Sequence, residues 1–227
     1  MALVLYMHPL ASFCHKVQIA LYENGTPFEA RMVDLADEES SADLIRSWAI
    51  GKIPMLKDTA RDRTIPETSI IIEYLDRHYP GPVRLIPDDF EPGLSARLWD
   101  RFFDLYVSVP MQKIVLDRLR LDGQKDPAGV ADAYQMLKTA YDMAEQHLAG
   151  TTWANGETFS IADCAALPAL FFADTLLPFS QSHPVLAAYF ERLLARPSVT
   201  RVLDEARPYF QYYPYKEKLS VRFYQPG

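Results

Sequence analysis

The chain has 227 residues, 49% of them hydrophobic and 23% charged, so it can form one large domain or two small ones around a packed core. Its net charge of −7 disfavours nucleic acid and anionic membranes as partners, and no apolar run is long enough to span a bilayer. No secretory signal is visible, and the two cysteines, Cys14 and Cys164, have no metal-ligand spacing, so we expect no disulfide framework, no metal and a cytoplasmic location.

The first predicted elements are a strand over residues 3–6 and a helix that begins near Ser12 and stops at residues 24–25. Pro9 separates the two elements. The Ser12 hydroxyl and the Cys14 thiol therefore lie at the amino end of a helix, where unpaired N–H groups and the helix dipole favour an anion. That anion could be a thiolate of Cys14 or of a bound ligand. Alternatively, Ser12 only caps the helix and Cys14 only packs beneath it.

A second strand is predicted within residues 26–35, which completes a β-α-β unit with parallel strands and a right-handed crossover. A short mobile helix is expected over residues 37–48, although this polar segment could also be a solvated loop. Another strand starts directly after Pro54, because proline cannot donate to a strand ladder. A very short strand follows at residues 64–65.

The next helix starts at Thr68 or Ser69 and follows Glu67, so acidic and hydroxyl groups again lie at a helix amino end, which is typical of an N-cap. Residues 78–92 are rich in proline and glycine, which predicts a linker between two domains. The predicted division is an α/β domain at residues 1–80, a linker at 81–92 and an all-helical domain at 93–227.

The second half of the chain shows only helical patterns. Two long antiparallel helices are predicted over residues 94–121 and 130–148, and the first should kink at Pro110. Ser160 and Asp163 match a capping box, whose loss should cost about 1 kcal/mol. The helix that they start is apolar nearly all round, which is typical of a helix in the middle of a bundle.

The chain resembles the soluble glutathione transferase family over essentially its whole length. The resemblance is carried by the turn with Ser12 and Cys14, the Lys52-Ile53-Pro54 segment, Glu67-Thr68 at a helix start, and the Ser160/Asp163 box. Each motif is weak alone, but their order and spacing make the combination specific. The resemblance implies a thioredoxin-like α/β domain followed by an all-α helical bundle, in a bacterial-like class that uses serine or cysteine.

The resemblance also implies how glutathione is held. The Ile53 backbone would pair with the cysteinyl part of glutathione, and the Pro54 peptide bond would be cis. Glu67 and Thr68 would hold the γ-glutamyl group, with threonine where the family has serine, and Lys52 would meet the glycyl carboxylate. The Ser160/Asp163 box is assigned to folding and not to chemistry.

The catalytic role is assigned to Ser12 first, to Cys14 second and to His8 a distant third. Some classes of the family use a serine two positions before a cysteine, as here. Other classes use position 11, which is an inert alanine in this chain. A redox pair with Cys14 would need a cysteine at that position, which argues against a glutaredoxin-like mechanism.

A hydrophobic electrophile is expected in a second pocket. Its lining is predicted to include Trp99, Phe103, Tyr106 and Met111. An aromatic tail at residues 208–215, which lacks a helical pattern, could wall this pocket or form part of an interface. We therefore predict a homodimeric glutathione transferase of the detoxifying kind. The alternatives are a glutathione-dependent thiol-disulfide oxidoreductase or isomerase that uses Cys14, and a non-catalytic glutathione-binding module.

Overall fold

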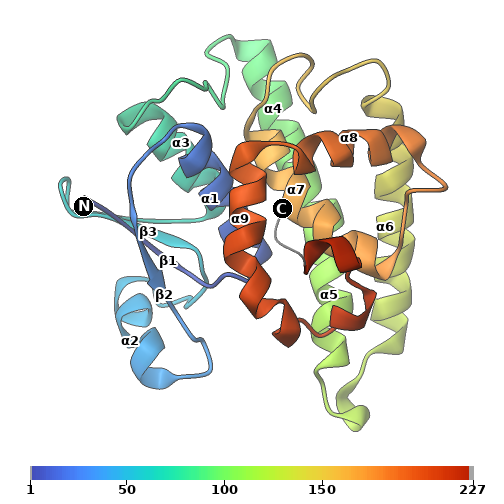
Figure 1. Ribbon diagram of the computed structural model, residues 1–227. Helices are drawn as coiled ribbons and strands as arrows, with labels where there is room; N and C mark the ends of the chain where they lie inside the picture. The colour runs from blue at the N-terminus through green and yellow to red at the C-terminus, as the bar shows by residue number, and fades with distance from the viewer. Residues whose placement is uncertain (1, 225–227) are drawn as a thin grey trace.

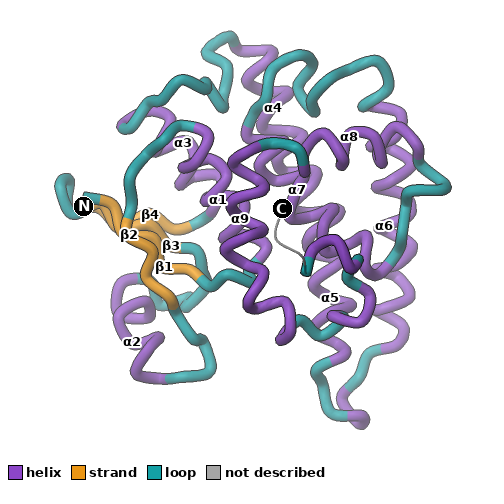
Figure 2. Tube along the Cα trace, viewed as in Figure 1, coloured by secondary structure: helices purple, strands orange, loops and turns teal. Residues whose placement is uncertain are grey.

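A four-stranded sheet with the order β2-β1-β3-β4 forms the centre of the first domain. β1 (Leu3–Met7) pairs in parallel with β2 (Glu29–Met32) and antiparallel with β3 (Met55–Asp58), which pairs antiparallel with β4 (Arg63–Pro66). All four strands, orange in Figure 2, lie in this domain of the computed structural model, which describes residues 2–224.

Helices cover both faces of this sheet because the side chains of β1 alternate between two apolar clusters. Leu3 and Leu5 pack in the main core, which includes apolar residues of α1 (Ser12–Glu23) and α3 (Thr68–His78). Val4 and Tyr6 instead belong to a second cluster with Leu44 of α2 (Glu38–Ser47). The predicted thioredoxin-like arrangement is confirmed.

The second domain is helical, as predicted (Figure 1). Its helices are α4 (Phe90–Phe102), α5 (Val109–Arg118), α6 (Pro127–His147), α7 (Ile161–Leu176), α8 (Pro184–Leu194) and α9 (Pro197–Ala206). In α7 every residue except Asp174 is buried, and this helix contacts both α1 and α4. The helix that the sequence placed in the middle of the bundle therefore also joins the two domains.

The capping box at the start of α7 is confirmed, with both reciprocal hydrogen bonds present between Ser160 and Asp163. The Asp163 carboxylate also accepts from the Ala154 N–H at 2.9 Å and from the Tyr189 O–H at 2.7 Å. Asp163 is fully buried, so these donors replace the water that it loses. The box therefore anchors the loop before α7 and the helix α8, besides capping α7.

Three details differ from the sequence prediction. Where the sequence predicted a kink at Pro110, a π-helical turn at Phe103–Ser108 separates α4 from α5, and Pro110 lies in the first turn of α5, where its missing N–H is tolerated. α4 begins at Phe90, inside the predicted linker. The aromatic tail is partly helical, with a 3-10 helix at Arg207–Tyr212 whose Phe210 is buried.

Within residues 2–224, no helix is both long and apolar enough to cross a membrane.

Candidate functional site

The amino end of α1 offers unpaired donors. Ser12 is the first residue of the helix and Ala11 is its N-cap, so the interpretation of Ser12 as a cap is wrong. The N–H groups of Cys14 and His15 both donate to the Ala11 carbonyl, at 2.8 and 3.2 Å. The N–H groups of Ser12 and Phe13 have no acceptor within residues 2–224. These donors and the helix dipole make this end of α1 suited to an anion.

The Ser12 hydroxyl lies at the boundary between the two domains. Only 5% of the residue is exposed, and its Oγ accepts a hydrogen bond of 3.3 Å from Nε2 of Gln112 on α5. Gln112 was not among the site residues predicted from the sequence. No local pattern could have done so, because the contact is set by the docking of one domain on the other.

Cys14 lies on the inner side of α1 and is fully buried. Burial raises the pKa of its thiol to about 12, although a hydrogen bond with the His8 backbone acts in the opposite direction. The thiol therefore stays protonated at neutral pH and cannot be reached by a substrate, so the geometry argues against the catalytic role considered for Cys14. Cys164 is buried as well and packs in the core.

The aromatic tail reaches the turn before α1. The ring of Tyr209 packs edge-on against His8, with 5.6 Å between ring centroids. His8 accepts a hydrogen bond of 3.2 Å from the Leu10 N–H, and partial burial lowers the pKa of its imidazole. Tyr209 also lines a cavity of about 220 Å³ between β1, β2 and α9. The tail thus walls a cavity beside this turn, while its buried residues belong to the core.

The segment before β3 presents backbone groups without partners. The Ile53–Pro54 peptide bond is cis, as the resemblance implied. The pairing of β1 with β3 ends at Tyr6 and Met55, and within the described chain neither the N–H nor the C=O of Ile53 has a hydrogen-bond partner. Lys52 precedes it and is exposed. Ile53 can therefore pair with an extended peptide.

The start of α3 also presents polar groups that are available to a ligand. Glu67 has φ of 67° and ψ of 119°, a conformation that residues other than glycine rarely adopt. Such strain often occurs at ligand sites. Glu67 occupies the N-cap position of α3, as the sequence predicted, but its side chain makes no capping hydrogen bond. Thr68 follows as the first residue of α3, and its hydroxyl has no hydrogen-bond partner among residues 2–224.

The strand register brings these three segments to one end of the sheet. Tyr6 of β1 lies opposite Met55 of β3, and Met55 lies opposite Pro66 of β4. The turn that follows β1, the Lys52–Pro54 segment and Glu67-Thr68 therefore leave the sheet at the same edge. Together they form a polar site in which the Ser12 and Phe13 N–H groups, the Ile53 backbone and the Thr68 hydroxyl have no partner among residues 2–224.

The predicted lining of the apolar pocket is only partly accessible. Phe103 and Met111 are 0% and 3% exposed and belong to the core, and the Trp99 ring stacks on His147 with centroids 3.5 Å apart. Tyr106 remains exposed, next to Phe102. The sequence showed two apolar stripes on this helix but not which of them faces the bundle.

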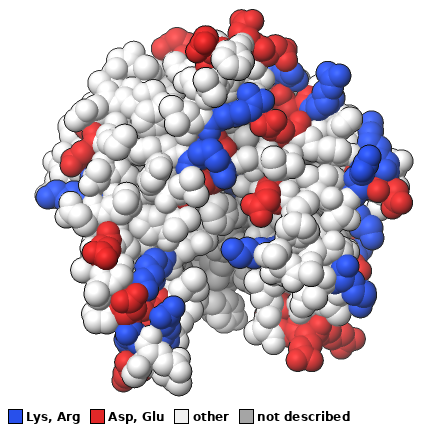
Figure 3. All heavy atoms as spheres, turned by 180° about the vertical axis from the view of Figure 1, so that it is seen from behind, with Lys and Arg blue, Asp and Glu red and all other residues white. Residues whose placement is uncertain are grey.

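Two other side chains of α5 lie on the same helix face as Gln112. Val109 and Leu116 lie one turn before and one turn after it, and they are 48% and 57% exposed. The molecular surface is hollowed between the two domains, and uncharged side chains dominate the inner wall of this hollow (Figure 3). Val109 and Leu116 are therefore exposed apolar side chains on the face of α5 that contacts Ser12 through Gln112.

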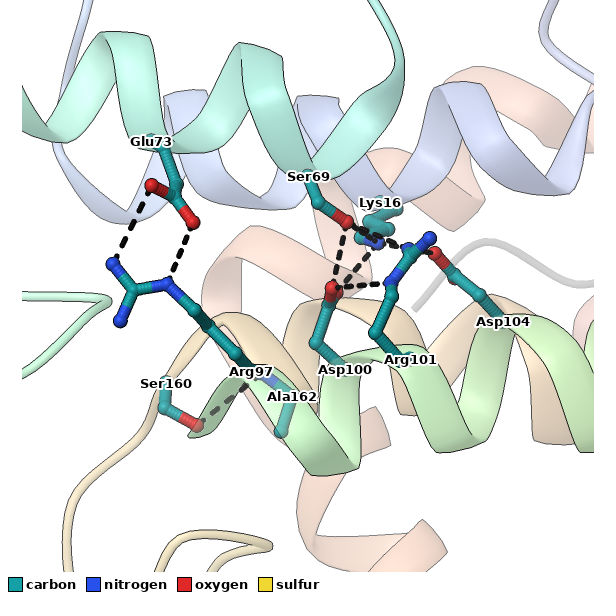
Figure 4. Close-up of polar contacts among 9 residues, drawn as sticks. All are labelled: Lys16, Ser69, Glu73, Arg97, Asp100, Arg101, Asp104, Ser160 and Ala162. Carbon is teal, nitrogen blue, oxygen red and sulfur yellow. Dashed lines mark hydrogen bonds and ion pairs between the residues drawn. The ribbon is translucent and has the colours of Figure 1, made fainter. Parts of the chain in front are cut away.

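A buried ion cluster holds α1 and α3 against α4 (Figure 4). We call Lys16, Ser69, Asp100, Arg101 and Asp104 the Lys16 cluster. The Lys16 Nζ lies 2.5 Å from Asp100, 2.6 Å from Asp104 and 3.0 Å from the Ser69 hydroxyl. Because Ser69 follows Thr68 directly, this cluster connects the amino end of α3 to the helix that begins with Ser12.

Comparisons with known proteins agree with this architecture. The family model for the glutathione S-transferase N-terminal domain matches residues 5–83, and the model for the C-terminal domain matches residues 127–192. Glutathione S-transferase U25 of Arabidopsis thaliana is 27% identical over 215 residues, which are 92% of each chain. A stringent starvation protein A homolog of Histophilus somni is 26% identical over 208 residues, which are 91% of this chain and 92% of that protein.

A solved structure of similar fold is a glutathione S-transferase from Methylobacillus flagellatus with glutathione bound. It superposes with a TM-score of 0.82 at 24% identity and covers 88% of this chain and 98% of its own. The described residues contain no group of three or more acidic, histidine or cysteine side chains that could hold a metal ion. From the two domain matches and the fold, we conclude that the chain belongs to the glutathione S-transferase family.

Proposed function

We propose that this protein is a glutathione transferase in which the Ser12 hydroxyl and the amino end of α1 keep the thiol of bound glutathione deprotonated. The observation that carries this proposal is that Ser12 begins α1 without capping it. The proton of the Ser12 hydroxyl and the backbone N–H groups of Ser12 and Phe13 therefore remain available to an anion. Glutathione fits this end of the sheet best, because its sulfur can lie at the amino end of α1 while the rest of the tripeptide reaches the Lys52–Pro54 segment and Glu67-Thr68.

The chemistry needs only a modest change in the thiol. A free thiol has a pKa of about 8.5, so little of it is ionised at neutral pH. Lowering this pKa by about 2 units requires about 2.7 kcal/mol, which one hydrogen bond to an anion and the helix dipole can supply. The sulfur then forms a bond with the electrophilic carbon, and the leaving group departs with its electron pair. The thiol proton has already passed to solvent.

The rest of glutathione would be held by the other polar groups at this end of the sheet. The Ile53 backbone would pair with the cysteinyl residue as an added strand. The Glu67 carboxylate would meet the γ-glutamyl ammonium, and the Thr68 hydroxyl at the start of α3 would meet the α-carboxylate. Lys52 would meet the glycyl carboxylate. The strained backbone of Glu67 supports this assignment, because no capping hydrogen bond of the Glu67 side chain accounts for the strain.

The electrophile would bind in the hollow between the domains, against Val109 and Leu116, and would be hydrophobic. A second candidate function is a glutathione-binding module without turnover, because at least one relative, the stringent starvation protein A homolog, does not carry the name of a transferase. The thiol-disulfide alternative is disfavoured by the burial of Cys14.

A titration of the wild-type complex separates these functions. We expect glutathione to bind, its thiol to ionise well below pH 8.5 when followed by thiolate ultraviolet absorbance, and 1-chloro-2,4-dinitrobenzene to be conjugated. S-methylglutathione, which has no ionisable thiol, is the binding control. Binding without a lowered thiol pKa and without turnover of any electrophile in a panel would support the binding module and contradict the proposed chemistry.

We also propose a homodimer formed through α4. Phe90, Leu94 and Leu98 are exposed on this helix, and Ile70 is exposed on the neighbouring α3. A second copy of the chain would remove this apolar surface from water.

The dimer is tested by placing a charge on this surface. Leu98→Arg should convert a dimer to a monomer in sedimentation velocity experiments, because the interface would bury an unpaired cation. Met143→Arg, at an exposed position of α6, is the matched control and should leave the sedimentation coefficient unchanged. A wild-type protein that sediments as a monomer would contradict the proposal.

A further inference from the structure

Gln112 is the feature of the site that the proposed chemistry does not yet use. Its Nε2 lies 3.3 Å from Oγ of Ser12, which is almost completely buried. Within residues 2–224, no other side chain makes a hydrogen bond with this oxygen. The donor comes from α5 in the helical domain, whereas Ser12 begins α1 in the α/β domain.

The direction of this hydrogen bond determines what the hydroxyl can do next. A serine hydroxyl has one proton to donate and two lone pairs that accept. The Gln112 amide occupies one lone pair and leaves the proton of the hydroxyl unused. A hydroxyl that accepts one hydrogen bond is also polarised and becomes a better donor in the next one.

We propose that Gln112 is a positioning residue that directs the Ser12 proton to the glutathione sulfur. This inference rests on the proposed function, because it assumes that Ser12 stabilises the thiolate. Gln112 acts through Ser12 and does not touch the reacting atoms. Since Val109 and Leu116 flank it on the same face of α5, the helix that would hold the electrophile also orients the hydroxyl that activates the nucleophile.

Two substitutions at this position separate hydrogen bonding from packing. Gln112→Met keeps the length of the side chain and its helix propensity but removes the donor. Gln112→Glu keeps the shape but reverses the polarity, because a carboxylate would accept the Ser12 proton and turn it away from the sulfur. Gln135→Met, at an exposed position of α6, is the control for the same replacement elsewhere.

The readout is the pKa of the thiol in the glutathione complex, which a merely structural residue would not move. Gln112→Met should raise this pKa by about 0.5 to 1 unit, the equivalent of one neutral hydrogen bond. Gln112→Glu should raise it further. The affinity for S-methylglutathione should be unchanged in both variants, and Gln135→Met should match the wild type in every measurement.

The Ser12→Ala background distinguishes failure of this inference from failure of the proposed function. If Gln112 acts through Ser12, Gln112→Met should have no further effect on the thiol pKa once the hydroxyl is absent. If Ser12→Ala raises the thiol pKa and Gln112→Met does not, the positioning role is overturned and the proposed function stands. If Ser12→Ala leaves the thiol pKa unchanged, both are overturned.

Discussion

Replacing Lys16 with methionine is expected to lower the free energy of unfolding by about 3 to 5 kcal/mol, as is usual when one partner of a buried ion pair is removed. Lys16 is the buried cation between Asp100 and Asp104, both of which are themselves buried. In the variant, Arg101, whose side chain is exposed, would be the only cation paired with these two carboxylates among residues 2–224. Methionine fills most of the volume of lysine, so the loss reports charge more than packing.

The dependence of this loss on pH identifies its cause. Burial raises the pKa of Asp104, and the Lys16 charge acts against that rise. Without Lys16, Asp104 of the folded variant would hold its proton more tightly than in the unfolded chain, so acidification would favour the folded variant. The difference between variant and wild type should therefore be largest at neutral pH and shrink as the pH falls into the range where Asp104 protonates.

Denaturant unfolding monitored by circular dichroism at several pH values measures both effects. Lys138→Met, at an exposed position of α6, should change stability by less than about 0.5 kcal/mol. Adding Asp104→Asn to Lys16→Met should recover part of the loss, because one uncompensated charge is gone. A Lys16→Met protein that loses less than about 1 kcal/mol at neutral pH would show that the Lys16 cluster does not hold α1 and α3 against α4.

The sequence predicts well whatever depends on local pattern. The start of α1 follows from the proline before it and from the apolar spacing after it. The capping box of α7 is visible because its two partners, Ser160 and Asp163, lie three residues apart. The thioredoxin-like fold of the α/β domain was implied by the resemblance, and the observed register explains why Ile53 and Thr68 lie at the same edge of the sheet.

What the sequence missed depends on how the two domains meet. Gln112 and Ser12 are 100 positions apart in the chain, and neither position carries a local signal for the other. The apolar pocket was assigned to Phe103 because periodicity shows that a stripe exists, but not whether it faces the core. Asp100 and Asp104 did carry a signal. Like charges one turn apart on a helix repel each other, so the pair predicts a cation between them.

Replacing Ser12 with alanine is the second change with a large expected effect, this time on catalysis. The substitution removes a hydrogen bond to the sulfur anion, worth about 1.5 to 3 kcal/mol, and should raise the thiol pKa of bound glutathione by about one to two units. The N–H groups of Ser12 and Phe13 and the dipole of α1 would remain. The variant should therefore bind S-methylglutathione as tightly as the wild type.

The pH profile of kcat/KM for 1-chloro-2,4-dinitrobenzene carries the decisive result. At the pH where half of the wild-type complex is ionised, the Ser12→Ala rate should be lower by about 5- to 50-fold, which is the ratio of the two thiolate fractions. At roughly three units above that pH both complexes are mostly ionised, and the two rates should converge to within about twofold.

Cys14→Ala is the matched control, because a buried thiol with a pKa of about 12 contributes no thiolate at these pH values, and its profile should follow the wild type. A Ser12→Ala deficit of the same size at every pH would mean that the hydroxyl orients the substrate and does not ionise it. If instead kcat/KM is lost in Cys14→Ala while the pH profile of Ser12→Ala matches the wild type, the catalytic role belongs to the Cys14 thiol.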